Sequence, residues 1–312
     1  MQIISGTTEF HIEDCTAVAI GKFDGVHRGH KEIMAHVLEA GNEGFKTAIF
    51  TFDPIPSVFF GGENVKELTT RSEKELLFEK LGIDYLVEFP FNIQTAQMDP
   101  QTFVKEVLLE KVNAGLIIAG DDISFGKDGK GNDVLLEQMS VTEHFQVRII
   151  KKICRKNREI SSTYVREALE KGDVSLAGDL LGEPFFVMGI VEEGNRFGRT
   201  MGIPTINLYP EKRKLLPPSG VYFSSIEIND RMLYGVTNIG QKPTVSEKGK
   251  ISVETFIFDF AEDIYGCKVK VNLLHFEREE RRFSSVEELQ QEILKNIEDG
   301  KNFFEKRRKK PE

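Results

Sequence analysis

Segments with the pattern of buried strands alternate with segments of helical periodicity in the first half of the chain, and this alternation constrains the fold most strongly. Strands are expected at residues 16–20, 47–52, 85–89 and 116–119, and helices at 30–40, 73–81 and 101–111. Strands that alternate with helices pair in parallel through crossover connections. The pattern therefore predicts an α/β domain built on a doubly wound parallel sheet.

The second half of the chain changes rhythm, because strand-like segments follow one another with few helices between them. They lie at residues 184–192, 221–228, 232–236, 251–260 and 268–276. Asn229-Asp230 is a plausible hairpin turn between two of them. Short strands at this spacing predict a small antiparallel β-barrel.

A terminal helix is expected after two serines that could cap it. Ser284 and Ser285 each precede a glutamate by three residues, as in a capping box. The apolar stripe of this helix consists of Val286, Leu289, Ile293 and Ile297. The rhythm changes near Gly182-Glu183-Pro184, so the two predicted domains span residues 1–182 and 183–312, and a length of 312 residues also favours two domains.

Composition excludes several classes of protein. The formal net charge of -9 argues against a nucleic-acid partner, which would require a basic face. Cys15, Cys154 and Cys267 are far apart, so neither a disulfide framework nor a zinc site is indicated. The first residues lack the pattern of a signal peptide, and no apolar stretch approaches the roughly 18 residues of a membrane span. We expect a cytoplasmic protein with small-molecule partners; its oligomeric state is not predicted.

The strongest local signal follows the first strand and opens the first helix. It reads Gly21-Lys22-Phe23-Asp24-Gly25-Val26-His27-Arg28-Gly29-His30. Unpaired N–H groups at a helix start favour phosphate, and Gly25 and Gly29 let the backbone approach closely. His27 and His30 can both donate hydrogen bonds to phosphate oxygens. Two alternatives stay open at this point, namely a metal site and a plain structural turn.

A second element reads Ile160-Ser161-Ser162-Thr163-Tyr164-Val165-Arg166 and enters another helix. Its hydroxyls, N–H groups and Arg166 make a second anion-binding unit. The alternative is that these residues only cap the helix.

Together the two elements resemble the H-x-G-H and I-S-S-T-x-x-R signatures of the nucleotidyltransferase superfamily, which implies a Rossmann-like domain. Within it, F-D-G-V-H-x-G-H is similar to prokaryotic FAD synthetases. The resemblance implies that His27 and His30 contact ATP phosphates as catalytic residues, and that Ser162, Thr163 and Arg166 hold the phosphate chain. Gly21, Phe23, Asp24, Gly25 and Gly29 complete the implied ATP-binding set.

Two segments depart from the usual family pattern. Ile55 stands where the family usually has histidine, and Ile123 and Ser124 stand where an aromatic residue and a basic or hydroxyl residue are common. Asp122 and Phe125 of the same loop are retained, and they are the expected flavin-binding residues there.

A second cluster lies in the other half, from Gly194 to Asn207. Its glycines permit a tight phosphate loop, and Thr205 and Asn207 offer oxygen ligands suited to Mg²⁺. It contains neither a Walker A loop nor the protein-kinase motifs. The segment resembles the riboflavin kinase motif G-R-x-x-G-x-P-T-x-N. The expected phosphate-binding residues are Gly194, Gly198, Arg199 and Gly202.

The resemblance to riboflavin kinases extends downstream. It implies that Glu254 is the base that accepts the riboflavin hydroxyl proton; the alternative is an outward-facing strand residue. Arg278 matches a family arginine near the flavin and nucleotide, with a salt bridge to Glu277 or Glu280 as the rival interpretation. Asn296 stands where the family often has aspartate, and we assign it no role.

These resemblances cover nearly the whole chain in the expected order. They imply an enzyme that uses ATP and Mg²⁺ to phosphorylate riboflavin to FMN and to adenylylate FMN to FAD. Two alternatives are retained: only one activity survives, or the chain is a flavin- or nucleotide-sensing regulator without turnover.

Overall fold

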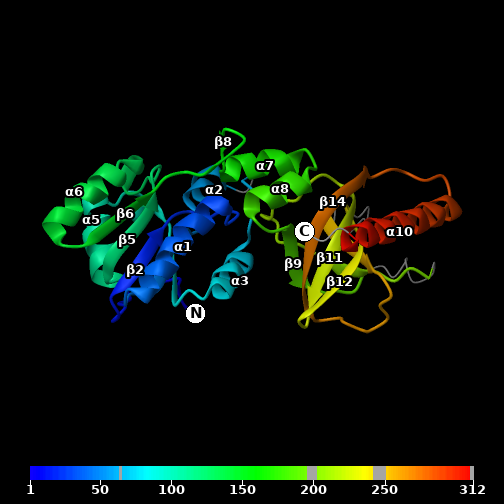
Figure 1. Ribbon diagram of the computed structural model, residues 1–312, viewed down its shortest axis with the longest axis horizontal. Helices are drawn as coiled ribbons and strands as arrows, with labels where there is room; N and C mark the ends of the chain where they lie inside the picture. The colour runs from blue at the N-terminus through cyan, green and yellow to red at the C-terminus, as the bar shows by residue number, and fades with distance from the viewer. Residues whose placement is uncertain (63–64, 195–201, 242–250, 310–312) are drawn as a thin grey trace. The chain divides into compact units, whose positions relative to one another are not determined.

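The computed structural model describes residues 1–62, 65–194, 202–241 and 251–309, except for the side chain of residue 241. Contacts between residues divide the chain into two compact units, Met1–Tyr164 and Val165–Glu312 (Figure 1). The division falls inside helix α7 (Ser162–Glu170). The domain boundary expected after residue 182 lies beyond it and stays a prediction.

Unit 1 is built on a six-stranded sheet in the order β1-β4-β3-β2-β5-β6, with every neighbouring pair parallel. Its strands are β1 (Gln2–Ser5), β2 (Thr16–Ile20), β3 (Lys46–Asp53), β4 (Tyr85–Pro90), β5 (Ala114–Gly120) and β6 (Gln146–Ile150). The chain leaves β2 toward β3 and β4 on one side and later returns to β5 and β6 on the other. This confirms the doubly wound α/β prediction, and it puts the switch point, where such sheets bind ligands, between β2 and β5.

Helical segments connect these strands. They are α1 (Arg28–Asn42), α2 (Pro56–Gly61), α3 (Arg71–Leu81), α4 (Ile93–Ala96), α5 (Pro100–Thr102), the π-helix η2 (Phe103–Lys111), the 3₁₀-helix η3 (Lys127–Gly129) and α6 (Asp133–Glu143). A short hairpin of β7 (Cys154–Arg155) and β8 (Arg158–Glu159) precedes α7. The helices expected at 30–40 and 73–81 are confirmed, whereas most of the helix expected at 101–111 is a π-helix.

Unit 2 continues with α8 (Val174–Leu181) and a curled antiparallel sheet in the order β10-β13-β12-β11-β14-β9. Its strands are β9 (Phe185–Ile190), β10 (Ile206–Leu208), β11 (Gly220–Ile228), β12 (Arg231–Gln241), β13 (Ile251–Ile257) and β14 (Lys268–Glu279). A bridge between Glu192 and Asn207 brings the two ends of the sheet together. Asn229 and Asp230 both have positive φ, which confirms the predicted hairpin turn. The barrel-like prediction is confirmed.

The terminal helix α10 (Val286–Arg308) uses one of its two predicted capping pairs. Ser285 is the N-cap, and its hydroxyl accepts from the Glu288 N–H at 3.1 Å. Of the predicted stripe, Leu289, Ile293 and Ile297 are partly buried and Val286 is 50% exposed, whereas the fully buried positions are Asn296, Gly300 and Phe304. Because Gly300 has no side chain, α10 can pack closely on the sheet; a Cβ there would lie 3.0 Å from the Phe258 ring.

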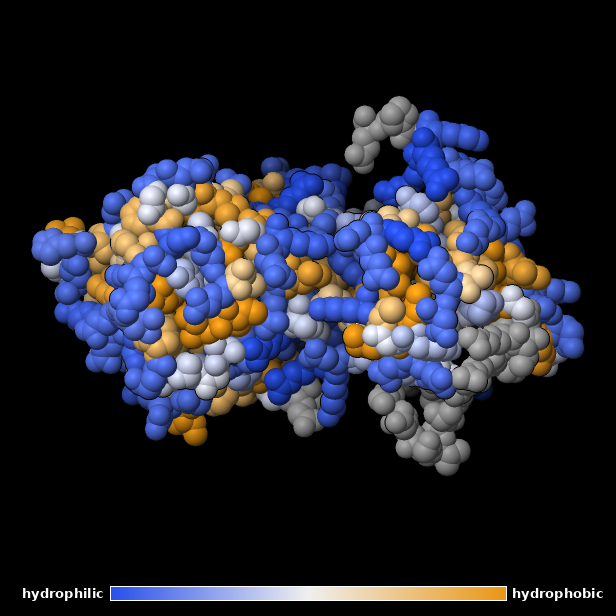
Figure 2. All heavy atoms as spheres, turned by 90° about the horizontal axis from the view of Figure 1, so that it is seen from below, coloured by the Kyte–Doolittle hydropathy of each residue, from blue (hydrophilic) through white to orange (hydrophobic). Residues whose placement is uncertain are grey.

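No helix within the described ranges is long and apolar enough to cross a membrane. The face shown in Figure 2 intersperses hydrophobic side chains with hydrophilic ones.

Candidate active sites

The loop after β2 leads into α1, and its two histidines, His27 and His30, lie at the start of that helix. His27 is the N-cap of α1, and its Nδ1 accepts a hydrogen bond from the backbone N–H of His30 at 3.3 Å. The two imidazole rings are stacked, with centroids 3.7 Å apart. The predicted pair therefore lies together at a helix N-terminus, beside the switch point of the sheet, where anions bind favourably.

Burial keeps both imidazoles neutral near pH 7. It lowers the pKa of His27 from 6.5 to about 4, against the opposing effect of the Asp122 carboxylate. The pKa of His30 is lowered well below 6.5, first by burial and then by the charge of His27. The buried Nδ1 of His30 has no hydrogen-bond partner within the described structure. A phosphate group bound here would supply a partner and would raise both pKa values.

Two other predicted residues of this loop point inward and support it. Phe23 is 1% exposed, and its ring packs edge-on against His30 at 5.2 Å between centroids. A Cβ on Gly21 would lie 2.9 Å from that ring, which explains the glycine. The Asp24 carboxylate accepts a hydrogen bond from the backbone N–H of Leu68 at 2.8 Å. Any contact of Phe23 or Asp24 with ATP stays a prediction.

The backbone of the same loop is strained. Gly25 has φ +89°, which glycine tolerates, but Val26 has φ +43°, which is rare for a β-branched residue. The Gly25 N–H donates to Thr69 Oγ1 at 3.1 Å. A Cβ on Gly29 would lie 3.2 Å from the His27 ring, so glycine leaves room for that ring. Backbone strain of this kind concentrates at functional sites.

The second predicted element meets this loop. Ser162 Oγ donates to the backbone oxygen of Asp24 at 2.8 Å, joining segments 138 residues apart. Ser161 also caps α7, since its hydroxyl accepts from the backbone N–H three residues on at 3.3 Å. Thr163 is exposed. Arg166 lies in the part of α7 assigned to unit 2. The capping interpretation applies to Ser161, and the phosphate contacts of Ser162, Thr163 and Arg166 stay predictions.

The two predicted flavin-binding residues in the loop after β5 differ in their exposure to solvent. Asp122 is exposed and close enough to His27 to influence its pKa. Phe125 is only 5% exposed and packs against Phe103, with ring centroids 5.6 Å apart. The departure at Ile55 fills the hydrophobic core, because this side chain is 1% exposed. Any contact of Asp122 or Phe125 with a ligand stays a prediction.

Sequence reasoning missed an aromatic cluster where β3 and β4 end. The Phe91 ring lies 5.2 Å from that of Phe52, 5.3 Å from that of Phe59 and 5.8 Å from that of Phe60. Phe60 is 72% exposed. The carboxyl ends of parallel strands are the usual binding edge, and the Phe59-Phe60 pair just after the Pro56 helix start was the available signal.

The second candidate site lies in unit 2, where β10 pairs with β13. Asn207 is paired directly with Glu254, and Glu254 is paired on its other side with Asn238 of β12. Directly paired residues present their side chains on the same face of a sheet. Glu254 is partly buried, and its Oε1 accepts from Ser252 Oγ at 3.2 Å. Register thus puts the predicted base beside one predicted metal ligand.

Gly194 packs directly on Asn207. A Cβ at this position would lie 2.6 Å from Asn207 Cγ, so only glycine fits. Gly202 has φ +73° and open space around it. The predicted phosphate-binding residues Gly198 and Arg199 lie outside the described residues.

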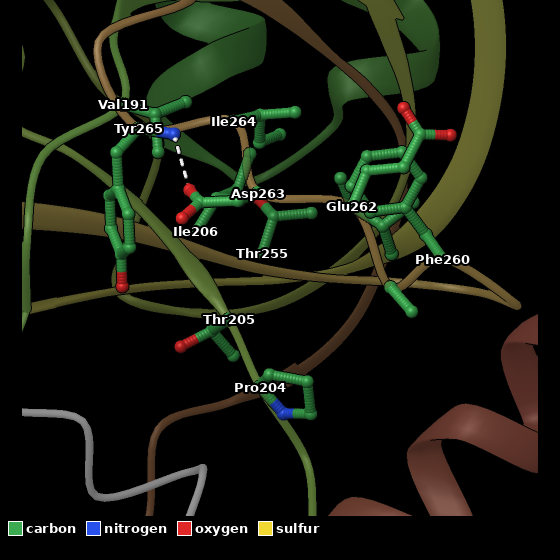
Figure 3. A pocket seen from close by; sticks show the side chains of 12 residues that line it. Val191, Pro204, Thr205, Ile206, Thr255, Phe260, Glu262, Asp263, Ile264 and Tyr265 are labelled. Carbon is green, nitrogen blue, oxygen red and sulfur yellow. Dashed lines mark hydrogen bonds between the residues drawn. The ribbon is translucent and has the colours of Figure 1, made fainter.

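Thr205 lies on the wall of a pocket of about 330 Å³ (Figure 3). Apolar side chains line most of it, including Val191, Ile206 and Ile264. The segment from Phe260 to Tyr265 forms one wall, where the Tyr265 N–H donates to the Asp263 carboxylate at 3.2 Å. The pocket is of a size and polarity that suit an aromatic ring.

Arg278 is held by α10 rather than by either glutamate of its own strand. Its Nη2 donates to Asn296 Oδ1 at 2.8 Å, and its Nε lies 3.1 Å from Glu292 Oε1. The salt-bridge partner expected at Glu277 or Glu280 was therefore wrong. Asn296, to which no role was assigned, is 3% exposed and orients this guanidinium.

Within the described residues, no three His, Cys, Asp or Glu side chains gather as a metal site. The His27–His30 pair therefore has no further ligand of these types there, and the predicted metal ligands Thr205 and Asn207 carry oxygen donors of a kind that suits Mg²⁺.

Comparisons with known proteins match both halves of the chain. A family model for FAD synthetase matches residues 10–164, and one for riboflavin kinase matches residues 181–304. A bifunctional riboflavin kinase/FMN adenylyltransferase of Bacillus subtilis is 35% identical over 94% of both chains. One of Escherichia coli K12 is 33% identical over 94% of this chain and 93% of its own.

A solved structure described as a macrolide-efflux protein from Streptococcus pneumoniae shares the fold. Its TM-score is 0.82 at 30% identity, with 96% of this chain and 97% of that chain covered. Because both domains are present in order and the similarity spans almost the entire length, the chain belongs to the bifunctional riboflavin kinase/FMN adenylyltransferase family.

Proposed function

We propose that unit 1 transfers the adenylyl group of ATP to FMN, giving FAD and pyrophosphate, and that unit 2 transfers the γ-phosphoryl group of ATP to riboflavin, giving FMN. The observation that carries the first assignment is the hydrogen bond from Ser162 to Asp24, which brings two distant motifs together beside the stacked histidines. The register of Asn207 with Glu254 carries the second.

For adenylyl transfer, a phosphate oxygen of FMN attacks the α-phosphorus of ATP, and the bond to pyrophosphate breaks. No covalent enzyme intermediate is needed. His27 and His30 act as hydrogen-bond donors whose affinity for the transferred group rises as charge accumulates on its oxygens. The unpartnered Nδ1 of His30 supports this role. Ser162, Thr163 and Arg166 hold the phosphate chain.

The flavin of FMN stacks on the aromatic cluster at the ends of β3 and β4. The exposed Phe60 ring and its neighbour Phe91 offer apolar faces to a flat ring system. Asp122, near His27, borders the same edge of the sheet. This assignment adds residues that the sequence motifs do not contain.

For phosphoryl transfer, Glu254 accepts the proton of the riboflavin primary alcohol as its oxygen attacks the γ-phosphorus. Thr205 and Asn207 hold Mg²⁺, which when bound neutralises charge on the phosphates. The oxygen donors fit this ion, and the lack of a side chain at Gly194 leaves space beside the Asn207 amide. The pocket beside Thr205 receives the base of ATP, and Arg278 borders the flavin.

We further propose that the domain boundary follows residue 182 and that the protein works in the cytoplasm. The riboflavin kinase match, which starts at residue 181, supports that boundary. The ATP requirement of both reactions favours that compartment.

The proposal is tested with two single-site variants. His30→Ala should abolish FAD formation from FMN and ATP while FMN formation continues, and Glu254→Gln should lower riboflavin phosphorylation by orders of magnitude while adenylylation continues. A mixture of the two proteins should then convert riboflavin to FAD, because free FMN passes from one to the other. Unchanged FAD output from His30→Ala would defeat the first site, and a normal kinase rate in Glu254→Gln would remove that residue from the mechanism.

A further inference from the structure

An ion pair between the buried Glu88 and the half-exposed Arg71 belongs to neither sequence motif. Glu88 lies in β4 and is only 2% exposed. Its Oε2 lies 2.6 Å from Nη2 of Arg71, the first residue of α3, so the two groups form an ion pair by distance, although this oxygen has no hydrogen-bond partner within the described structure. The same guanidinium reaches Glu75 at 3.0 Å and Asp53 at 3.6 Å. A buried carboxylate is costly unless it is paired, so its position calls for an explanation.

The segment just before Arg71 holds the histidine loop directly. The backbone N–H groups of Leu68 and Thr69 donate to the Asp24 carboxylate at 2.8 and 3.4 Å. Thr69 Oγ1 in turn accepts from the backbone N–H of Gly25 at 3.1 Å. Any shift of this segment would therefore move the strained turn that carries His27.

Helix α3 also supports the second histidine through its side chains. Phe78 of α3 packs edge-on against Phe23, with centroids 6.1 Å apart, and Phe23 packs against His30. Arg71 is thus at the N-terminus of a helix that packs against the loop, directly after the segment that hydrogen-bonds to it. Glu88 lies in β4, between β1 and β3 of the sheet, and its ion pair with Arg71 links the start of α3 to that strand.

We propose that Glu88 and Arg71 are positioning residues for adenylyl transfer, because their ion pair fixes α3 and α3 fixes the geometry of His27 and His30. The inference rests on the proposed role of these histidines. Alignment at the reacting centre is steeply distance-dependent, and a displacement of about 1 Å can cost roughly 100-fold in rate.

The pH dependence of this pair provides an independent readout. Burial raises the pKa of Glu88 from 4.5 to about 7, despite the attraction of Arg71. The other charged groups that face it are Glu75 and Lys74 of α3 and Asp53 of β3. Only the ionised carboxylate pairs fully with Arg71. The rate of adenylylation should therefore rise as the pH increases through about 7, where Glu88 loses its proton.

The test compares Glu88→Gln with Glu75→Gln, a matched variant that removes another carboxylate from the same guanidinium. We expect Glu88→Gln to lower the kcat of adenylylation about 10- to 100-fold, to leave the KM values for ATP and FMN within about threefold, and to flatten the pH profile. Riboflavin phosphorylation should be unchanged in both variants. Glu75→Gln should adenylylate normally.

A normal kcat and pH profile in Glu88→Gln would overturn the proposal. If that variant fails to fold, Arg71→Lys is the alternative test, because lysine keeps the positive charge but lacks the planar guanidinium. A normal adenylylation rate in Arg71→Lys would also overturn the proposal. If the unmodified protein makes no FAD at all, it is the proposed function that fails, and the two outcomes are therefore distinguishable.

Discussion

Replacing Gly194 with alanine tests whether the geometry of Asn207 controls the kinase site. The added Cβ would lie 2.6 Å from both Cγ and Oδ1 of Asn207, well inside normal contact distance. Asn207 cannot easily give way. Its side chain is 5% exposed, and its backbone oxygen accepts from the Glu192 N–H at 2.9 Å. The clash must therefore displace either the amide or the strand that carries it.

Two magnitudes follow from this clash. Overpacking a closely packed position costs about 1–3 kcal/mol, so unit 2 should unfold at a lower denaturant concentration. If the amide moves by about 1 Å, the kinase rate should fall roughly 100-fold, because Asn207 and Glu254 lose their alignment. The adenylyl-transfer rate, measured on the same protein, should not change.

The assay is riboflavin phosphorylation at saturating ATP and Mg²⁺, with FMN measured by chromatography. Gly189→Ala is the matched control, because Gly189 lies in β9 of the same unit and its Cβ would meet Leu208 at an ordinary 3.6 Å. We expect the control to keep both its stability and its kinase rate. A Gly194→Ala protein with normal kinase activity would refute the reasoning that Asn207 must stay where it lies.

Three further predictions concern charge and packing. Since the folded state lowers the pKa of His27 from 6.5 to about 4, the stability it contributes is present above pH 6.5 and is lost as pH falls toward 4; His27→Asn should remove up to about 3 kcal/mol of that acid sensitivity in pH-dependent unfolding. Asn296→Ala should destabilise unit 2 by about 1–3 kcal/mol in urea unfolding, because two hydrogen bonds to the Arg278 guanidinium are lost. Gly300→Val should lower the thermal midpoint of unit 2, since a Cβ there already lies 3.0 Å from the Phe258 ring; an unchanged midpoint would show that α10 can move away from the sheet.

The sequence predicted best what is decided locally. The helix expected at 30–40, found as Arg28–Asn42, follows from a buried strand, a glycine-rich turn and an amphipathic pattern, and all three are read from adjacent residues. The hairpin at Asn229-Asp230 is local in the same sense, since both residues tolerate positive φ. The order of the motifs along the chain was enough to indicate both units.

What the sequence could not give depends on tertiary contacts. The apolar flanks of Glu254 left its facing undecided, and the register puts it on the same face of the sheet as Asn207. The apolar stripe of α10 contains three partly buried residues but does not include the fully buried Asn296, which is stabilised by Arg278. A buried polar residue such as Asn296 cannot be found from the hydrophobic periodicity of a helix.

Strands β1 and β6 were missed for a related reason. They are the two edges of the parallel sheet, and their residues are partly or fully exposed, so neither shows the continuous apolar run of a central strand. The pair of Glu88 and Arg71 was also invisible, because two charged residues 17 positions apart indicate nothing until the fold brings them to 2.6 Å.

The most direct test of the account is a time course of the purified protein with riboflavin, ATP and Mg²⁺, with the flavins separated by chromatography. If two separate sites act in sequence, FMN should appear first and FAD should follow at its expense, with one pyrophosphate released for each FAD. Accumulation of FMN without FAD, or riboflavin left unchanged, would contradict the account.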